Sequence, residues 1–341
     1  MLRVRDSTGI GLHANRQPAT SKKMIVQKNN YEKEETMRVQ FKKILCATDF
    51  SDFSNHTVTY GVALAKEFGA RLIICHVIDL SSVAIYGEFQ LDPVGQQNRI
   101  IEDANEQLEA LTGDQPVDWE PLITVGKPAD EIIRAVEEKD IDLVISATRG
   151  RSGLKRLILG SVTERLMLTL PCPLLVLRSP EHDIVKTPDQ VFRLKKILVG
   201  CDFSPDSGQA LNHALSLAQE FEAELHLVNV IEAPAQPNFL RGATPATEEI
   251  QVDFRELLSQ KLKELVPAEA RNWCTPQTSI LEGQPYEALA QYAESNNVDM
   301  IVMGIRGHGL VKTLFLGSTT DRVVRRAPCP VLSVGSMVSG E

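Results

Sequence analysis

A glycine-rich segment near the carboxyl terminus has the composition of a phosphate-binding loop. Two residues separate Gly304 from Gly307, and nine more precede the pair Gly317-Ser318, giving the pattern G-x2-G-x9-G-S. Glycines let backbone N–H groups approach an anion closely, and a helix that begins at Gly-Ser offers N–H donors and the positive end of its dipole. The spacing therefore predicts a phosphate site at the start of a helix.

A similar segment occurs earlier in the chain. Gly150 is followed after nine residues by Gly160 and Ser161, but Ala147 stands where the later segment has its first glycine. We expect the methyl group of Ala147 to hinder the closest approach of a ligand to the backbone. The earlier site should therefore bind equally well or more weakly.

Cationic side chains gather in these two loops, although the chain as a whole is acidic. The 36 Lys and Arg residues against 45 Asp and Glu residues give a formal net charge of −9. Local positive charge suits a polyphosphate, or it simply balances the acidic body in a solvated loop. No broad basic face is expected, so nucleic-acid binding is not predicted. The cations are Arg149, Arg151, Lys155 and Arg156 in the first loop, and Arg306, His308 and Lys312 in the second.

The triplet Asp-Phe-Ser also occurs twice, each time directly after an apolar run. It begins at Asp49, after Thr48, and again at Asp202, after Cys201. A carboxylate at a strand end can accept hydrogen bonds from a ribose or an adenine amino group, or it can cap the following helix. The sequence leaves both roles open. Neither turn has the G-x-G-x-x-G pattern, which argues against a nicotinamide or flavin enzyme.

These paired features belong to an internal duplication. The segment 42–51 recurs at 195–204, and Pro171-Cys172-Pro173 recurs at residues 328–330. The period of about 155 residues far exceeds the roughly 20–50 residues of solenoid repeats, so it indicates a duplicated domain. We expect a disordered or additional leader at 1–40, a first domain at 41–179, a linker at 180–192 and a second domain at 193–337.

Within each copy, apolar runs of strand length alternate with amphipathic stretches of helix length. Such alternation predicts an α/β domain in which right-handed crossovers build a five-stranded, mostly parallel sheet with helices on both faces. Ligands bind these sheets at the carboxyl ends of the strands, where the aspartates and glycine loops should meet. The predicted strands are 43–47, 71–78, 117–124, 141–147 and 173–178, then 196–201, 224–231, 273–280, 298–304 and 330–334.

Taken together, residues 41–335 resemble two universal stress protein domains in tandem. The resemblance rests on Asp-Phe-Ser after the first strand, on the glycine pattern and on Pro-Cys-Pro before the last strand. It also rests on His76-Val77-Ile78 and Asn229-Val230-Ile231 at the end of the second strand. It implies a flavodoxin-like or Rossmann-like fold of the adenine nucleotide alpha hydrolase type, often dimeric through the last strand. In one branch of the family it implies binding of ATP or AMP.

In that branch, the first Asp and the second-strand Val contact ribose and adenine, and the glycine loop holds the phosphates. The resemblance thus implies ATP as the ligand, with ADP or AMP as alternatives and Mg²⁺ as a companion of the nucleotide. The implied site in the first copy comprises Thr48, Asp49, Val77, Ala147, Arg149, Gly150, Arg151, Gly160, Ser161 and Val162. In the second copy it comprises Cys201, Asp202, Val230, Gly304, Arg306, Gly307, His308, Gly317, Ser318 and Thr319.

The leading functional hypothesis is a stress-response module that binds an adenine nucleotide to sense or signal. No convincing nucleophile or base accompanies the loops, because His308 is the only histidine within either glycine loop. We therefore assign no catalytic residue and no metal site, and expect at most weak ATPase activity. The alternatives are a protein that acts through partners without nucleotide, a slow ATPase, and an adenylating or pyrophosphatase enzyme. The last would need a glycine-rich loop after the first strand, which neither copy has.

Cysteine usage and hydropathy predict where the protein resides and how it assembles. The six cysteines form no C-x-x-C pair and lie in or beside apolar runs, typical of buried thiols in a reducing compartment. The sequence has no run of about 18 apolar residues, which a membrane-spanning helix would need, and no apolar segment typical of a secretory signal. We expect a cytoplasmic protein. Its apolar last strands should pair as an internal pseudo-dimer or in a homodimer, with protein partners unknown.

Overall fold

The computed structural model describes residues 39–79, 93–148, 159–178, 185, 187, 190–232, 245–307 and 316–335. The expected leader therefore lies outside the described residues except for Val39 and Gln40. Among the helices that are described, none is both long and apolar enough to cross a membrane.

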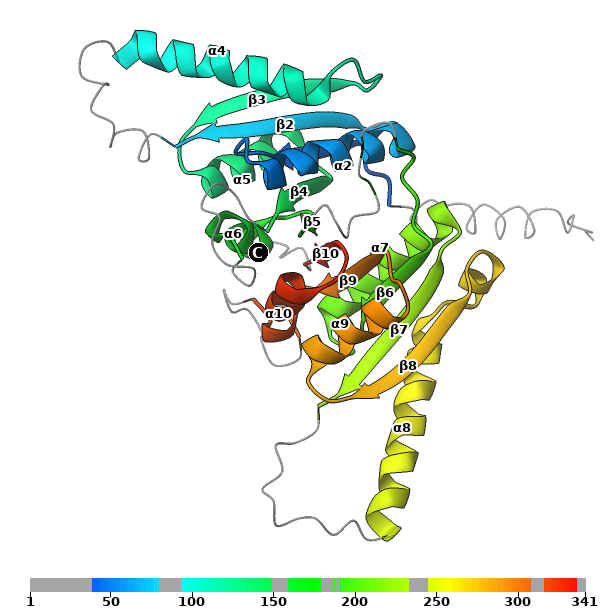
Figure 1. Ribbon diagram of the computed structural model, residues 1–341. Coiled ribbons are helices and arrows are strands. Elements are labelled where there is room, and N and C mark those ends of the chain that lie inside the picture. The colour runs from blue at the N-terminus through cyan, green and yellow to red at the C-terminus, as the bar shows by residue number, and fades with distance from the viewer. Residues whose placement is uncertain are drawn as a thin grey trace, which may run out of the picture. The chain divides into compact units, whose positions relative to one another are not determined.

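The described elements alternate as the apolar pattern predicts (Figure 1). The N-terminal half contains β1 (Lys43–Ala47), α2 (Asp52–Phe68), β2 (Arg71–Ile78), α4 (Pro93–Thr112), β3 (Trp119–Val125), α5 (Pro128–Lys139), β4 (Leu143–Ala147), α6 (Ser161–Thr169) and β5 (Leu174–Leu177). The C-terminal half contains β6 (Lys196–Gly200), α7 (Pro205–Phe221), β7 (Glu224–Ile231), α8 (Pro245–Leu265), η4 (Ala268–Asn272), β8 (Pro276–Glu282), α9 (Pro285–Ser295), β9 (Met300–Gly304), α10 (Ser318–Arg326) and β10 (Val331–Val334).

The ten strands form one sheet in the order β3-β2-β1-β4-β5-β10-β9-β6-β7-β8. Within each half the strands are parallel, which confirms the predicted pair of five-stranded parallel α/β sheets. In each half the strand order reverses between the first and fourth strands, β1 beside β4 and β6 beside β9. The carboxyl ends of these pairs are where a ligand site is expected.

Helices cover both faces of the sheet, as predicted. Strand residues point alternately to the two faces, so Ile44 and Cys46 join one buried cluster while Leu45 joins the other. The first cluster includes residues of α2, α4, α7 and α8, and the second includes residues of α5, α6, α9 and α10. Strands buried on both faces explain why their sequences read as continuous apolar runs.

The two halves meet through their last strands. β5 and β10 pair in antiparallel orientation, with Leu332 opposite Leu175. The Ser333 hydroxyl donates to the carbonyl oxygen of Leu174 at 3.0 Å, and the Arg178 guanidinium donates to that of Ala327 at 2.7 Å. The described chain thus contains the strand pairing that we expected of an internal pseudo-dimer.

A buried aromatic cluster lies beside this junction, on the α2 and α7 face. Phe192 lies in the expected linker yet is only 1% exposed, and its ring centroid lies 5.4 Å from that of Tyr60 and 5.2 Å from that of Phe221. Phe68 extends the cluster, 5.9 Å from Phe221. The cluster therefore joins side chains from both halves of the chain.

Candidate functional site

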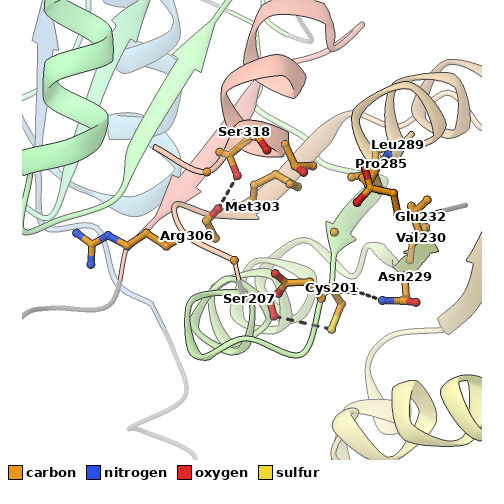
Figure 2. Close-up of a pocket in the computed structure, with 18 residues that line it drawn as sticks. Cys201, Ser207, Asn229, Val230, Glu232, Pro285, Leu289, Met303, Arg306 and Ser318 are labelled. Carbon is orange, nitrogen blue, oxygen red and sulfur yellow. Dashed lines mark hydrogen bonds between the residues drawn. The ribbon is translucent and has the colours of Figure 1, made fainter. Parts of the chain in front are cut away.

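Each half has a pocket at the carboxyl ends of its strands. The pocket of the C-terminal half, called site 2, has a volume of about 310 Å³ and lies between the strand ends and the start of α10 (Figure 2). The predicted residues in the described part of the chain all line it, and His308 lies outside that part. They are Cys201, Asp202, Val230, Gly304, Arg306, Gly307, Gly317, Ser318 and Thr319.

The pocket of the N-terminal half, called site 1, has a volume of about 320 Å³. It lies between the ends of β1, β2 and β4 and the start of α6. The predicted residues Arg149, Gly150 and Arg151 lie outside the described residues. The remaining ones all line site 1, namely Thr48, Asp49, Val77, Ala147, Gly160, Ser161 and Val162.

The two pockets match residue by residue. Every side chain of the described chain that lines site 1 has a counterpart lining site 2, 153 residues later up to Val77 and 157 residues later from Pro128 onward. The identical pairs are Asp49/Asp202, Ser54/Ser207, Val77/Val230, Pro128/Pro285, Gly160/Gly317, Ser161/Ser318 and Thr163/Thr320. The duplication has therefore preserved a whole pocket in each half.

The conserved aspartates support the caps of the following helices but are not the caps themselves. The Ser51 and Ser204 hydroxyls accept from backbone N–H groups as the N-caps of α2 and α7. Asp49 Oδ1 accepts from the Ser51 hydroxyl and the Ser54 hydroxyl, both at 2.6 Å. Asp202 Oδ1 accepts from the Ser204 hydroxyl at 2.5 Å. Each carboxylate is thus held in a fixed orientation at the rim of its pocket.

Gly307 lets the loop of site 2 pass close to this carboxylate. A Cβ atom at position 307 would lie 2.6 Å from Asp202 Oδ2, which is closer than real contacts allow. The second glycine of the G-x2-G pattern therefore brings backbone and carboxylate together at the mouth of the pocket.

Gly304 has a different role from the one that its place in the pattern predicts. A Cβ atom there would lie 2.6 Å from the carbonyl carbon of Asp206 and 2.8 Å from the nitrogen of Ser207, in the first turn of α7. The missing side chain therefore faces α7 and not the pocket. Ala147 occupies the same position of β4 and lines site 1, and the expectation that its methyl group hinders a ligand stays a prediction.

The helices that begin at the pockets have no side-chain cap. Gly160 and Gly317 are the N-caps of α6 and α10, and no described side chain accepts from the first-turn N–H groups there. The glycine N–H groups themselves bind carbonyl oxygens, Gly160 that of Thr148 at 2.9 Å and Gly317 that of Ile305 at 3.0 Å. A helix start without a side-chain cap offers donors and a positive dipole end to an anion. Both pockets therefore have one end suited to phosphate.

Arg306 shapes site 2 through its backbone. Its N–H donates to Asp206 Oδ2 at 3.0 Å, and its carbonyl oxygen accepts from the Ser204 hydroxyl at 3.3 Å. Figure 2 shows the guanidinium directed away from Asn229 and Val230, on the far side of the pocket. Arg306 lines the pocket, and its role as a phosphate ligand stays a prediction.

Several lining residues were not predicted from the sequence. In site 2 the Asn229 side chain lines the pocket and donates to the Cys201 carbonyl oxygen at 2.8 Å. Pro128 and Pro285 had a usable signal, since Gly-x-Pro recurs in both copies at the start of a helix. The others had none. They are Ala47, Ser54, Cys75, Ile132, Ser146 and Thr163 in site 1, and Gly200, Ser207, Val228, Glu232, Leu289, Met303 and Thr320 in site 2.

The thiols in the pockets are poor nucleophiles. Burial, together with the nearby Glu131 carboxylate, raises the pKa of Cys75 to about 12. Burial likewise raises the pKa of Cys201. Within the described ranges, no cluster of three or more His, Cys, Asp or Glu side chains could hold a metal ion. The arrangement is suited to holding a ligand with an apolar part, hydroxyl groups and an anionic end.

Comparison with known proteins covers both halves. The family model described as "Universal stress protein family" matches residues 40–178 and 193–335. Universal stress protein Slr1230 of Synechocystis is 24% identical over 313 residues, covering 86% of this chain and 99% of that protein. Universal stress protein MJ0531 of Methanocaldococcus jannaschii is 31% identical over 145 residues, covering 42% of this chain and 85% of that protein. The crystal structure of a universal stress protein from Archaeoglobus fulgidus has the same fold, with a TM-score of 0.61 at 24% identity over 87% of this chain and 99% of its own.

Proposed function

The chain belongs to the universal stress protein family through two tandem domains, and from this premise we propose that it binds an adenine nucleotide at site 1 and at site 2. Occupancy of these sites would make the protein a stress-response module that senses or signals. The observation that carries the proposal is the matched pair of pockets, each with a fixed carboxylate at one end and an uncapped helix start at the other.

The lining residues suit the three parts of such a nucleotide. Val77 and Ile132 in site 1, and Val230 and Leu289 in site 2, offer apolar surface against which a base can pack. The Asp49 and Asp202 carboxylates can accept hydrogen bonds from ribose hydroxyls. The starts of α6 and α10 can donate to phosphate oxygens. Volumes of about 310 and 320 Å³ lie at the lower end of the range for small-molecule sites.

ATP is the ligand that we propose, with ADP or AMP as alternatives and Mg²⁺ entering with the polyphosphate. Because a Cβ at Gly304, the counterpart of Ala147, would meet α7 and not the pocket, we expect site 1 to bind despite its alanine. The protein residues that would hold the nucleotide are Asp49, Val77, Gly160 and Ser161 in site 1, and Asp202, Val230, Gly307, Gly317 and Ser318 in site 2.

The decisive experiment identifies the ligand and counts the sites. The purified protein is denatured, any released nucleotide is identified by chromatography, and the stripped protein is titrated with ATP by calorimetry. Gly160→Asp and Gly317→Asp each place a negative charge at one helix start, so each should remove one of two binding equivalents. Gly160→Ala is the control, because its Cβ would lie at an acceptable 3.4 Å from the Thr148 carbonyl oxygen.

Two outcomes would reject the proposal. If the wild-type protein carries no nucleotide and shows no ATP binding, the protein acts through partners without nucleotide. If one aspartate variant alone abolishes all binding while both variants stay folded, the two pockets are not separate sites.

We also propose that the chain is cytoplasmic and that the β5–β10 pairing takes the place of a homodimer through these strands. The support is that the edges of both strands are already used within one chain. Size-exclusion chromatography with light scattering should give the mass of one chain, 37.7 kDa. A dimer mass would show that a second surface assembles the protein.

A further inference from the structure

Seven of the fourteen matched pairs that line the two pockets are identical, and three of the seven differing pairs lie next to one another. The identical pairs include the carboxylates, the helix-start Gly-Ser pairs and the threonines that follow them. The differing residues include a row of three neighbouring positions on the face of the sheet that carries α5 and α9. This row, called the floor, consists of Cys75, Ala47 and Ser146 in site 1, and of Val228, Gly200 and Met303 in site 2.

Strand register places the floor residues side by side. In site 2, Gly200 pairs with Val228 on one side and with Met303 on the other. In site 1, Ala47 pairs with Cys75, and Ser146 follows Ile145, the partner of Cys46. The floor therefore spans three adjacent strands beneath each pocket, and in site 1 its Ser146 contacts Thr163 in the first turn of α6.

The floor of site 2 is entirely apolar. A Cβ atom at Gly200 would lie 2.5 Å from the sulfur of Met303, so the glycine makes room for the thioether. Val228 and Leu289 lie beside it along the same pocket. Guanine carries O6, N1–H and N2–H₂ on the edge where adenine carries N1 and N6–H₂, so guanine loses more water contacts against this surface and gains no partner, which weakens its binding relative to adenine by about tenfold or more.

The floor of site 1 offers a hydrogen-bond acceptor instead. The Thr163 hydroxyl donates to the Ala147 carbonyl oxygen at 2.8 Å, so in its 3.0 Å contact with Ser146 it is the Ser146 hydroxyl that donates. Ser146 thus uses its hydrogen within the protein and keeps lone pairs for a ligand N–H. Ser146 is 5% exposed, so a donor that reaches it is shielded from water. The Cys75 thiol adds a weak donor at the other end of the floor, beyond Ala47.

We propose that the two sites bind ribose and phosphate through the same residue types but select different bases. Site 2 selects adenine and excludes guanine, whereas site 1 admits guanine nucleotides as well as adenine nucleotides. In site 1, Ser146 accepts from an N–H of the guanine edge, and Ser146 and Met303 are the residues that set the difference. The proposal rests on the proposed function, because it assumes that both pockets bind purine nucleotides.

The test compares ATP and GTP at each site alone. Gly317→Asp blocks site 2, so that only site 1 can bind, and Gly160→Asp blocks site 1, so that only site 2 can bind. Each variant is titrated with ATP and with GTP by calorimetry. We expect the GTP and ATP dissociation constants to agree within about threefold at site 1 and to differ by about tenfold or more at site 2. Exchanging the floor residues should transfer the preference, so Ser146→Met should weaken GTP at site 1 and Met303→Ser should strengthen it at site 2.

The Ser146→Ala variant distinguishes the effect of the lost hydrogen-bond acceptor from the effect of side-chain size. It keeps the room but removes the oxygen, so GTP should weaken by about tenfold while ATP changes less. If circular dichroism shows that Ser146→Met does not fold, Ser146→Ala serves as the test variant at site 1. Equal GTP-to-ATP ratios at the two sites, or ratios unchanged by the floor variants, would overturn this inference alone. Absence of ATP binding at both sites would overturn the proposed function and this inference with it.

Discussion

The Asn229 side-chain amide donates a hydrogen bond to the carbonyl oxygen of Cys201 at 2.8 Å, across the ends of β7 and β6. Asn229 is 9% exposed and Cys201 is 5% exposed, so little water can replace this bond. In the N-terminal half, His76 Nδ1 meets the Thr48 carbonyl oxygen at 2.9 Å. Two different side chains thus hold the same turn beside the two pockets.

This bond predicts the effect of substitutions at position 229. Asn229→Ala leaves the Cys201 carbonyl oxygen buried without its partner, which should lower the free energy of unfolding by about 1–3 kcal/mol. Asn229→His installs the side chain used at the equivalent position 76 and should restore most of the loss. Urea unfolding followed by circular dichroism measures both. Equal losses for the two variants would show that the amide bond is not what stabilises the turn.

The close approach of β9 to α7 predicts that Gly304 is required for stability. In Gly304→Ala the new Cβ meets the backbone of Asp206 and Ser207 at under 3 Å, so α7 must shift. We expect a loss of about 1–3 kcal/mol, measured by urea unfolding. Ala147→Gly is the matched change in the other half and adds no atom, so it should cost only the small penalty of a flexible glycine in a strand. An unperturbed Gly304→Ala variant would contradict the packing described above.

The buried ring of Phe192 predicts that the segment between the halves contributes to stability. Phe192→Ala should lower the free energy of unfolding by about 3–5 kcal/mol, because it leaves a cavity between Tyr60 and Phe221. The preceding residue, Val191, is 59% exposed and provides the control. Val191→Ala should stay within about 0.5 kcal/mol of wild type. If both variants behave alike, residue 192 acts as part of a simple linker.

The lowered pKa of His226 leads us to expect that the folded protein loses stability in mild acid. Burial lowers the pKa of His226 below its usual value of 6.5, although Glu224 Oε2, 3.4 Å from Nε2, favours the charged form. Above about pH 6.5 the imidazole is neutral in the folded and unfolded chains. As the pH falls below that value, the unfolded chain takes up the proton more readily, so stability is lost until the lowered folded pKa is passed.

The measurement is Tm from pH 7.5 to about 5.5 for wild type and His226→Gln. The variant removes this titration but leaves His213, whose pKa burial also lowers. We expect the wild-type Tm to fall more steeply, so the gap between the two proteins should narrow or reverse in acid. Parallel curves would show that His226 does not carry this part of the acid sensitivity.

Local patterns in the sequence predicted much of this protein. The duplication and the alternation of strands and helices follow from periodicity along the chain. Strands β2 and β7 match their predicted bounds, whereas the edge strands β3 and β8 begin later, at Trp119 and Pro276. Both edge strands are only partly buried, so their apolar pattern is weaker.

The candidate site, like the fold, could be predicted from the sequence only in part. The sequence could indicate Asp202, Gly317 and Ser318, because each stands in a motif at the end of a strand or the start of a helix. It could not show that Ser204 is the cap of α7 and Asp202 its support, because that depends on which atoms meet in the folded turn. It also could not show that Phe192, in a polar segment, lies in the core.

The sequence by itself determined the family resemblance, the two α/β units and the residues with phosphate-binding chemistry, since these depend on neighbours along the chain. Only the tertiary structure decided that Gly304 faces α7, and that Ser146 and Met303 line the floors of the two pockets. The physical reason is that successive strand residues face opposite sides of a sheet, so strand register decides which side chains share a pocket.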